Sequence, residues 1–184
     1  MIDQDRFVDV AFQIDANRIN SRESLPYMNQ LEAWHEAGVI LMHMSQVAQN
    51  EARSGTNSQR SKKALSYIFS VTYDDTPDEH EDLRAIEEAI FPGGATTTSE
   101  RNDVEVAFNA KKYGAILLTD DGASKRQPRG ILGSRGTLAR LGVQVMTDAA
   151  AVVYVRQKIA ERDQRLRLRA EREGTPLPEW VGAD

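Results

Sequence analysis

Four carboxylates stand at the points of this 184-residue chain where an α/β sheet usually gathers its functional side chains. Two of them come just after apolar runs that are predicted to be strands, and two lie on predicted helices. Carboxylates that converge in one pocket repel one another and stay ionised only if cations are present, and Mg²⁺ or Mn²⁺ prefers such hard oxygen ligands. We therefore predict a site for a divalent metal ion, formed by Asp15, Glu51, Asp103 and Asp121.

Metal ions held by carboxylates favour one kind of chemistry. They can generate hydroxide from water and stabilise negative charge on phosphoryl oxygens during in-line displacement, with paired ions about 3.5–4 Å apart. The expected reaction is therefore the hydrolysis of phosphodiester bonds.

The distribution of charge is consistent with a polyanionic substrate, although the net charge is −5. Residues 74–91 hold eight acids and one base, a charge of −7, so the rest of the chain carries +2. Lys and Arg side chains bind backbone phosphates whatever the base sequence. Two purely basic stretches follow candidate acids, and they contain Arg53, Arg60, Lys62 and Lys63, and then Lys125, Arg126, Arg129, Arg135 and Arg140. We expect Lys125, Arg126 and Arg129 to hold substrate phosphates.

Strands and helices alternate in the first part of the sequence. Residues 7–14 have apolar side chains on both faces of a period-two pattern, which is typical of a buried strand. Residues 25–37 have helical spacing, and residues 39–44 form a second apolar run. Ser45 suits the N-cap of a helix that reaches about Gly55. This alternation predicts a parallel sheet with helices on its faces.

The second part of the sequence continues the α/β pattern. Residues 61–73 and 79–91 have helical spacing, and Thr97 with Glu100 forms a capping box for a further helix. A strand over residues 115–118 is then expected. It should be followed by a basic, glycine-containing loop over 122–133, a helical stretch at 138–141, a short strand at 143–146 and a last, increasingly charged helix.

Composition limits where the protein can act. The chain has no cysteine, which excludes disulfides and thiolate metal ligands. It has no apolar run near the roughly 20 residues that span a bilayer, and no basic-then-apolar secretory signal. We predict a cytoplasmic protein that does not enter a membrane.

The four acids lie in motifs that resemble those of the PIN domain family, in the same order and with similar spacing over about residues 6–147. The first looks like the family's opening of hydrophobic residue, Asp, small residue and Asn, and the second resembles its serine-to-glutamate helix. The third is similar to its third acidic helix, and the fourth to its Thr, any residue, Asp ending. The motifs are Ile14 to Asn17; Ser45, Val47 and Glu51; Asn102, Asp103, Ala107 and Ala110; and Leu118 to Asp121.

The resemblance implies a fold, an activity and partners. The fold is a Rossmann-like parallel sheet sandwiched by helices, which we assign to residues 1–155. The charged helical tail that the sequence predicts at residues 156–184 has no counterpart in the family's minimal domain. The activity is that of a metal-dependent endoribonuclease that uses Mg²⁺ or Mn²⁺ and acts on RNA, frequently as the toxin of a toxin-antitoxin pair. An antitoxin-like protein and a second copy of the chain are the protein partners that the resemblance leaves open.

The resemblance also gives roles to single residues. It implies that Asp15, Glu51, Asp103 and Asp121 bind the metal and act in catalysis, and that Asn17 and Thr119 support the site beside the substrate. Asp120 matches the family's variable position, so we rank Asp121 above it as a ligand, and Glu105 is a less favoured substitute for Asp103. Arg18 departs from the family pattern, because an apolar residue is usual at that place.

Alternatives to this interpretation differ in function but share the fold. One is a catalytically silent PIN-like module that docks RNA or a protein, and another is a metal-dependent phosphatase or DNA nuclease. The charged tail is expected to be a solvated helix, and an arm that binds RNA or a partner is the alternative.

Overall fold

A parallel sheet forms the centre of this protein, which we describe from a computed structural model over residues 3–71, 73, 76–122 and 130–184. In that part of the chain the sheet has five strands, all parallel, in the order β3-β2-β1-β4-β5. The α/β fold predicted from the sequence is confirmed. The strands are β1 (Ala11–Ile14), β2 (Leu41–Ser45), β3 (Ile68–Ser70), β4 (Ile116–Leu118) and β5 (Val145–Met146).

The strand order reverses between β1 and β4. Strands β2 and β3 extend the sheet on one side of β1, and β4 and β5 extend it on the other side. The carboxyl ends of β1 and β4 therefore form a topological switch point, which is where ligands bind in open α/β sheets. Asp15 directly follows β1, and Thr119 directly follows β4.

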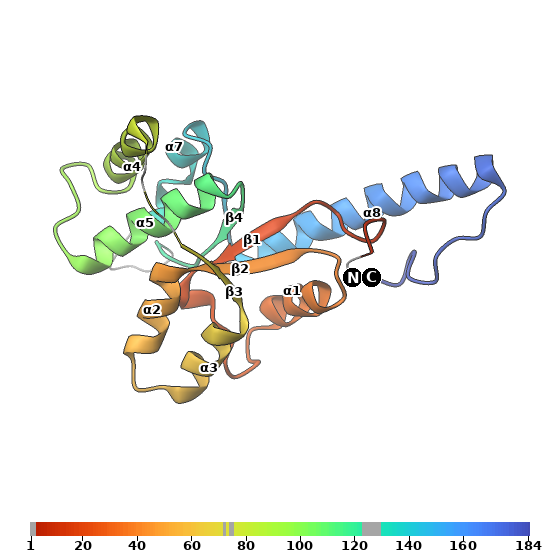
Figure 1. Cartoon of the computed structure of the whole chain (residues 1–184), viewed down its shortest axis with the longest axis horizontal. Helices are drawn as coiled ribbons and strands as arrows, with labels where there is room; N and C mark the ends of the chain where they lie inside the picture. Colours follow the sequence, from red (N-terminus) through yellow and green to blue (C-terminus); the bar gives the residue numbers. More distant parts are fainter. Residues whose placement is uncertain (1–2, 72, 74–75, 123–129) are drawn as a thin grey trace.

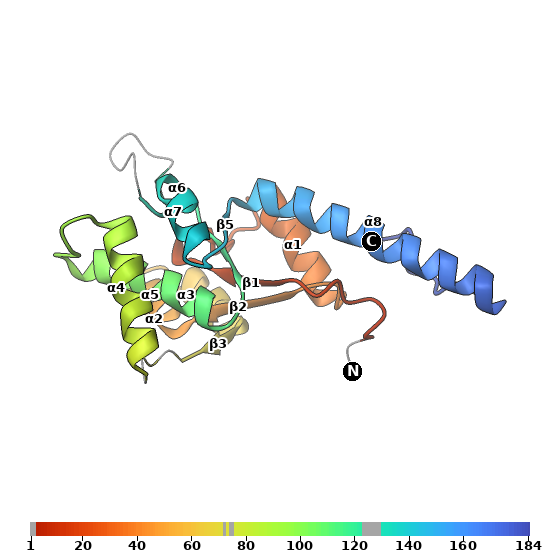
Figure 2. The same ribbon diagram turned by 90° about the horizontal axis from the view of Figure 1, so that it is seen from above.

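Helices cover both faces of the sheet (Figure 1 and Figure 2). Helices α1 (Pro26–Glu36) and α8 (Asp148–Glu173) lie together on one face. Helix α5 (Thr98–Lys112) covers the other, where Gln13 Nε2 donates a hydrogen bond of 2.7 Å to the carbonyl of Val106. Because both faces are covered, the inner strands are mostly apolar. The fully buried strand residues include Phe12, Ile14, Met42, Met44, Leu117 and Leu118.

The other helices lie at the rim of the sheet. Helix α4 packs against α5 and α7, and α2 packs against α3 and α5. A short 3-10 helix, η1, follows β1 and contacts α2. These elements are η1 (Ala16–Arg18), α2 (Gln46–Ser54), α3 (Ser58–Ser66), α4 (Pro77–Ile90), α6 (Gly130–Gly133) and α7 (Arg135–Arg140).

Three stretches differ from the sequence-based prediction. The helix predicted over residues 61–73 is instead α3 followed by strand β3, because main-chain pairing with β2 at the sheet edge competes with helical hydrogen bonds. The strand predicted to begin at residue 7 begins at Ala11, since Asp9 has a φ of 55° that interrupts extended backbone. The loop predicted to reach Gly133 ends earlier, in α6.

Helix α8 is part of the packed domain along most of its length. It runs without a break through residues 155 and 156, where the domain boundary was expected. Its apolar side packs inward through Ala151, Val152, Val155, Ile159 and Leu166, which are buried. The charged helix is therefore only partly solvated. None of the helices in the described part of the chain is long and apolar enough to cross a lipid bilayer.

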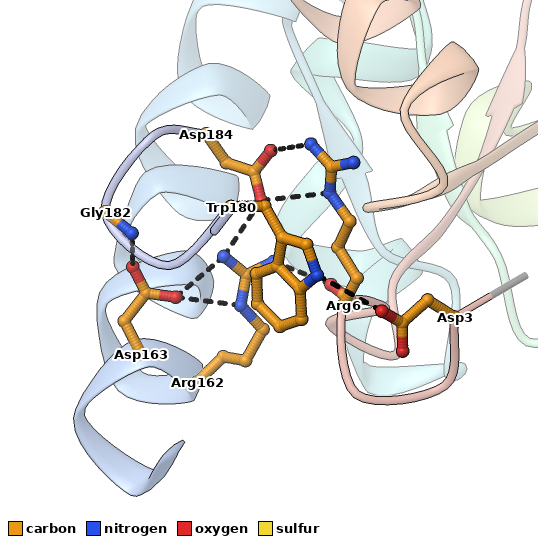
Figure 3. Close-up of polar contacts among 7 residues, drawn as sticks. All are labelled: Asp3, Arg6, Arg162, Asp163, Trp180, Gly182 and Asp184. Carbon is orange, nitrogen blue, oxygen red and sulfur yellow. Dashed lines mark hydrogen bonds and ion pairs between the residues drawn. The ribbon is translucent and has the colours of Figure 1, made fainter. Parts of the chain in front are cut away.

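A buried arginine joins α8 to both ends of the described chain (Figure 3). Arg162 is 2% exposed, and its Nε and Nη2 donate to Asp163 Oδ1 at 2.9 and 2.7 Å. Its Nη2 also lies 3.0 Å from Asp184 Oδ2, and its Nη1 donates to the carbonyl of Arg6 at 2.6 Å. The centroid of the Trp180 ring lies 4.6 Å from the guanidinium carbon. This cluster holds the segment after α8 against the N-terminal segment.

We expect the substitution Arg162→Leu to lower the free energy of unfolding by about 3–5 kcal/mol, because it leaves Asp163 buried without its cation and takes from Asp184 one of its two arginine partners, the other being Arg6. The control is Arg165→Leu, which removes an exposed arginine from the same helix and should change stability by less than about 0.5 kcal/mol. Urea denaturation measures both values. Equal losses in the two variants would contradict the structural role of Arg162.

Candidate functional site

A hydrogen-bond network joins the carboxyl ends of β1 and β4. The hydroxyl of Thr119 donates to Asp15 Oδ2 at 2.6 Å, and Asn17 Nδ2 donates to the same oxygen at 2.8 Å. Asn17 Nδ2 also lies 3.0 Å from Thr119 Oγ1. The main-chain N–H of Asp121 donates to Thr119 Oγ1 at 3.0 Å, and that of Asp120 donates to Asn17 Oδ1 at 3.1 Å. The network therefore orients the Asp15 carboxylate and the backbone that carries Asp121.

The two polar support residues differ in exposure. Thr119 is fully buried, so its hydroxyl positions Asp15 and is out of reach of a substrate. Asn17 is exposed, and its side chain stands between the ends of the two strands. Both residues were expected beside the substrate from the sequence, and only Asn17 has an accessible surface there.

Four separate elements carry the four acids. Asp15 follows β1, Asp121 lies beyond β4, Glu51 is on α2 and Asp103 is on α5. The start of each helix is set by local sequence. Ser45 Oγ accepts from the N–H of Ala48 and caps α2, and a capping box of Thr97 and Glu100 begins α5. Each helix presents its acid within about two turns of its first residue.

The four acids interact electrostatically. Burial raises the pKa of Asp103 to about 8, and the charges of four other acids add to the shift, namely Asp121, Asp15, Glu51 and Glu100. Burial likewise raises the pKa of Asp15 to about 6, with contributions from Glu51 and Asp121, against the lowering effect of the Thr119 hydrogen bond. The structure therefore brings the four acids near enough to repel one another.

The donor set agrees with a hard divalent cation. The site is made of carboxylates alone, and their mutual repulsion is the condition that a cation relieves. Among the residues that the structure describes, no three acidic or histidine side chains stand close enough together to coordinate one ion. The chemistry of the donors fits Mg²⁺ or Mn²⁺, and a tighter arrangement of the side chains is required to bind it.

Asp120 and Asp121 face different groups. Asp120 Oδ2 lies 3.0 Å from Arg18 Nη1 and is paired with it, whereas Asp121 contributes to the raised pKa values of Asp15 and Asp103. Arg18 is buried, and its Nη2 also lies 3.5 Å from Asp148 Oδ2 in the first turn of α8. The arginine that departs from the family pattern therefore links the end of β4 to α8.

Gly130 allows the chain to close beside Asp121. The N–H of Ile131 donates to Asp121 Oδ2 at 2.7 Å, and that of Leu132 donates to the Asp121 carbonyl at 3.0 Å. Gly130 has a φ of 38°, and a Cβ there would lie 2.4 Å from Asp121 Oδ2. Only glycine fits. This role of Gly130 could not be predicted from the sequence, because the close approach joins two residues that are nine positions apart in the chain.

The basic residues expected to hold phosphates after Asp121 lie outside the described part of the chain. They are Lys125, Arg126 and Arg129. Of the earlier basic stretch, Arg53 and Lys62 are exposed, and Lys63 Nζ is paired with Glu32 Oε2 at 3.0 Å.

Comparison with known proteins gives structural likeness alone. No model of a known protein family matches the chain, and no curated protein matches it. It is similar to a crystal structure of VapBC2 from Rickettsia felis bound to a DNA fragment from their promoter. The identity is 14%, the TM-score 0.45, and the match covers 75% of this chain and 98% of that one. It is also similar to a structure of FitAB bound to the IR36 DNA fragment, with 14% identity, a TM-score of 0.44, and 74% and 94% of the two chains covered.

The fold and the site define a class of protein. The chain is an α/β protein with a carboxylate cluster at the switch point of a parallel sheet. The fold agrees with the parallel α/β sheet that the resemblance of its sequence motifs to the PIN domain family implies.

We expect Gly130→Ala to lower the free energy of unfolding by about 1–3 kcal/mol, because the new Cβ meets Asp121 Oδ2 and the backbone φ is left-handed. The matched control is Gly136→Ala, since a Cβ there meets nothing within 4 Å and the residue lies in α7. The free energy of unfolding of the control should rise by about 0.5–1 kcal/mol. Chemical denaturation distinguishes the two, and a neutral Gly130→Ala would show that the approach to Asp121 is not close.

We expect Asp103→Asn to stabilise the metal-free protein in a pH-dependent way. The pKa of folded Asp103, about 8, lies above its ordinary value of 3.8, so ionisation favours unfolding and the wild type loses stability as the pH rises from about 4 to about 8. The variant lacks this loss. By pH 8 it should be more stable by at least about 1 kcal/mol, the equivalent of one pKa unit.

Thermal and urea unfolding in EDTA at pH 5 and pH 8 measure this difference. The control is Glu88→Gln, which removes one exposed negative charge from α4. A stability gap for Asp103→Asn that does not widen between the two pH values would contradict the assigned repulsion.

Proposed function

We propose that this protein is a metal-dependent endoribonuclease that hydrolyses phosphodiester bonds of RNA. The observation that supports it is that carboxylates from four elements lie near enough to one another at the switch point to raise the pKa values of Asp15 and Asp103, with a tighter arrangement required to coordinate one ion. A carboxylate cluster of this kind destabilises the fold unless a cation is bound, so its presence in the structure favours a function for it. The choice of RNA comes from the motif resemblance.

In this proposal Asp15, Glu51, Asp103 and Asp121 hold Mg²⁺ or Mn²⁺. The bound ion supplies an activated water and stabilises charge on the phosphoryl oxygens. Thr119 and Asn17 hold the Asp15 carboxylate in one orientation through their hydrogen bonds to its Oδ2. Ile131 holds Asp121 through its main-chain N–H, and Arg18 keeps the neighbouring Asp120 turned toward α8.

On the basis of the motif resemblance, the proposal also includes that this protein acts as the toxin of a toxin-antitoxin pair. An antitoxin-like protein is then the partner that restrains the nuclease. The alternative of a silent RNA-binding or protein-binding module shares the fold and differs in what happens when metal and RNA are added.

We expect Asp15→Asn to reduce Mn²⁺-dependent cleavage of RNA by more than about 100-fold, the upper end of the loss seen when only outer-sphere partners of a metal are changed. The variant should also lose the rise in Tm that Mn²⁺ gives the wild type, because a ligand stabilises only the state that binds it. The control is Asp78→Asn, which makes the same chemical change at an exposed position on α4.

Cleavage of RNA, DNA and small phosphate esters is assayed side by side. Undiminished cleavage by Asp15→Asn rules out the proposed site. A wild type that binds RNA without cutting it, and whose Tm does not respond to Mn²⁺, identifies the silent module. Cleavage of DNA or of phosphate esters in preference to RNA identifies the other nuclease or phosphatase.

A further inference from the structure

Arg60 on α3 reaches the backbone beside the carboxylate cluster. Its Nη2 donates a hydrogen bond of 2.9 Å to the carbonyl oxygen of Ala16, which directly follows Asp15. The start of α3 is itself held in place, because Asn57 Oδ1 accepts from the main-chain N–H groups of Gln59 and Arg60 at 3.1 Å. An arginine 44 positions along the chain is thereby anchored next to the first acid of the site.

Within the described part of the chain, the rest of the Arg60 guanidinium has no acidic partner. In residues 3–71, 73, 76–122 and 130–184, its only hydrogen bond is the one to Ala16 and no carboxylate forms an ion pair with it. Other cations nearby are neutralised: Arg18 pairs with Asp120 and Asp148, and Lys63 of the same helix pairs with Glu32. Arg60 is half-buried, so it is partly open to solvent.

An uncompensated guanidinium in this place suits a phosphate. Arginine has five N–H donors in a planar fork that matches two oxygens of a phosphate, and the bond to Ala16 uses one of them. The anchored side chain has already lost part of its freedom, which lowers the entropic cost of binding. The neighbouring acids repel a polyanion, so a held cation beside them guides the strand to the site.

We propose that Arg60 binds a backbone phosphate of the RNA strand at the edge of the carboxylate cluster, an inference that rests on the proposed nuclease function. The contact places the phosphodiester backbone alongside Asp15. It is independent of base identity, since phosphate contacts position a strand without reading its sequence. The proposal assigns this contact to Arg60 alone among the basic residues after Glu51. Arg53 and Lys62 in the same stretch are exposed.

The test compares Arg60→Gln, Arg60→Lys and the control Lys62→Gln, which removes the same charge from an exposed position on the same helix. The probe is a fluorescently labelled single-stranded RNA, and binding is followed by anisotropy at several salt concentrations with Ca²⁺ in place of Mg²⁺. Cleavage of the same RNA is followed with Mn²⁺, and the Tm of each variant is recorded.

We expect Arg60→Gln to weaken RNA binding by about 10-fold and to reduce the slope of log K against log salt by about 0.7, the value for one phosphate contact on a single strand. KM for cleavage should rise in parallel. Arg60→Lys should keep the salt slope, because it keeps the charge, and should lose part of the affinity, because it lacks the fork. Lys62→Gln should leave the slope and KM unchanged.

The outcomes separate this inference from the proposed function. If the wild type cleaves RNA, and Arg60→Gln and Lys62→Gln have equal RNA affinity, salt slope and KM, the role of Arg60 is overturned. The proposed nuclease function is then unaffected. Binding that falls in Arg60→Gln alone, in a protein that does not cut RNA, supports the phosphate contact and overturns the nuclease. A wild type that binds no RNA overturns both.

If Arg60→Gln has a lower Tm than the wild type, its weaker RNA binding could come from lost structure. The Arg60→Lys variant then distinguishes a phosphate contact from a purely structural role. If Arg60→Lys keeps the wild-type Tm and the salt slope but binds RNA more weakly, the phosphate contact is supported. If it binds RNA as tightly as the wild type while its Tm falls, the arginine serves only to tie α3 to η1.

Discussion

The site depends on the hydrogen bond from the Thr119 hydroxyl to Asp15 Oδ2, because it joins the ends of the two strands between which the sheet order reverses. Strands β1 and β4 come from distant parts of the sequence and are paired in parallel, so their carboxyl ends meet. Asn17 and the N–H of Asp121 complete the same network. The backbone that carries Asp121 is therefore held at this junction.

The carboxylate cluster opposes the stability of the fold that holds it. Burial and mutual repulsion raise the pKa values of Asp103 and Asp15, which means that their ionised forms are less stable in the folded protein than in the unfolded chain. The buried sheet and its helices supply the stability that keeps the acids together. In the proposed function a bound cation offsets the repulsion, and Arg60 contributes a positive charge that forms no ion pair with an acid of the described residues.

Two buried arginines integrate α8 into the domain. Arg18 connects the end of β4 to the first turn of α8 through Asp120 and Asp148, and Arg162 connects the middle of the helix to Asp184 and to the N-terminal segment. Both pair with carboxylates rather than stand alone, as burial of a charge requires. The charged C-terminal region is therefore anchored at both the site end and the far end of the sheet.

The sequence by itself determined the parallel α/β architecture and the places of Asp15, Glu51, Asp103 and Asp121, because strand periodicity, helix caps and the residues that follow a strand are local properties. Edge strand β3 was missed, since its pairing with β2 is not a local property. The tertiary structure alone decided that Asp120 turns to Arg18, that Gly130 must lack a side chain, that Arg162 is buried and that Arg60 reaches Ala16. Each of these depends on contacts between segments brought together by folding, and no spacing within the sequence encodes the distance between them.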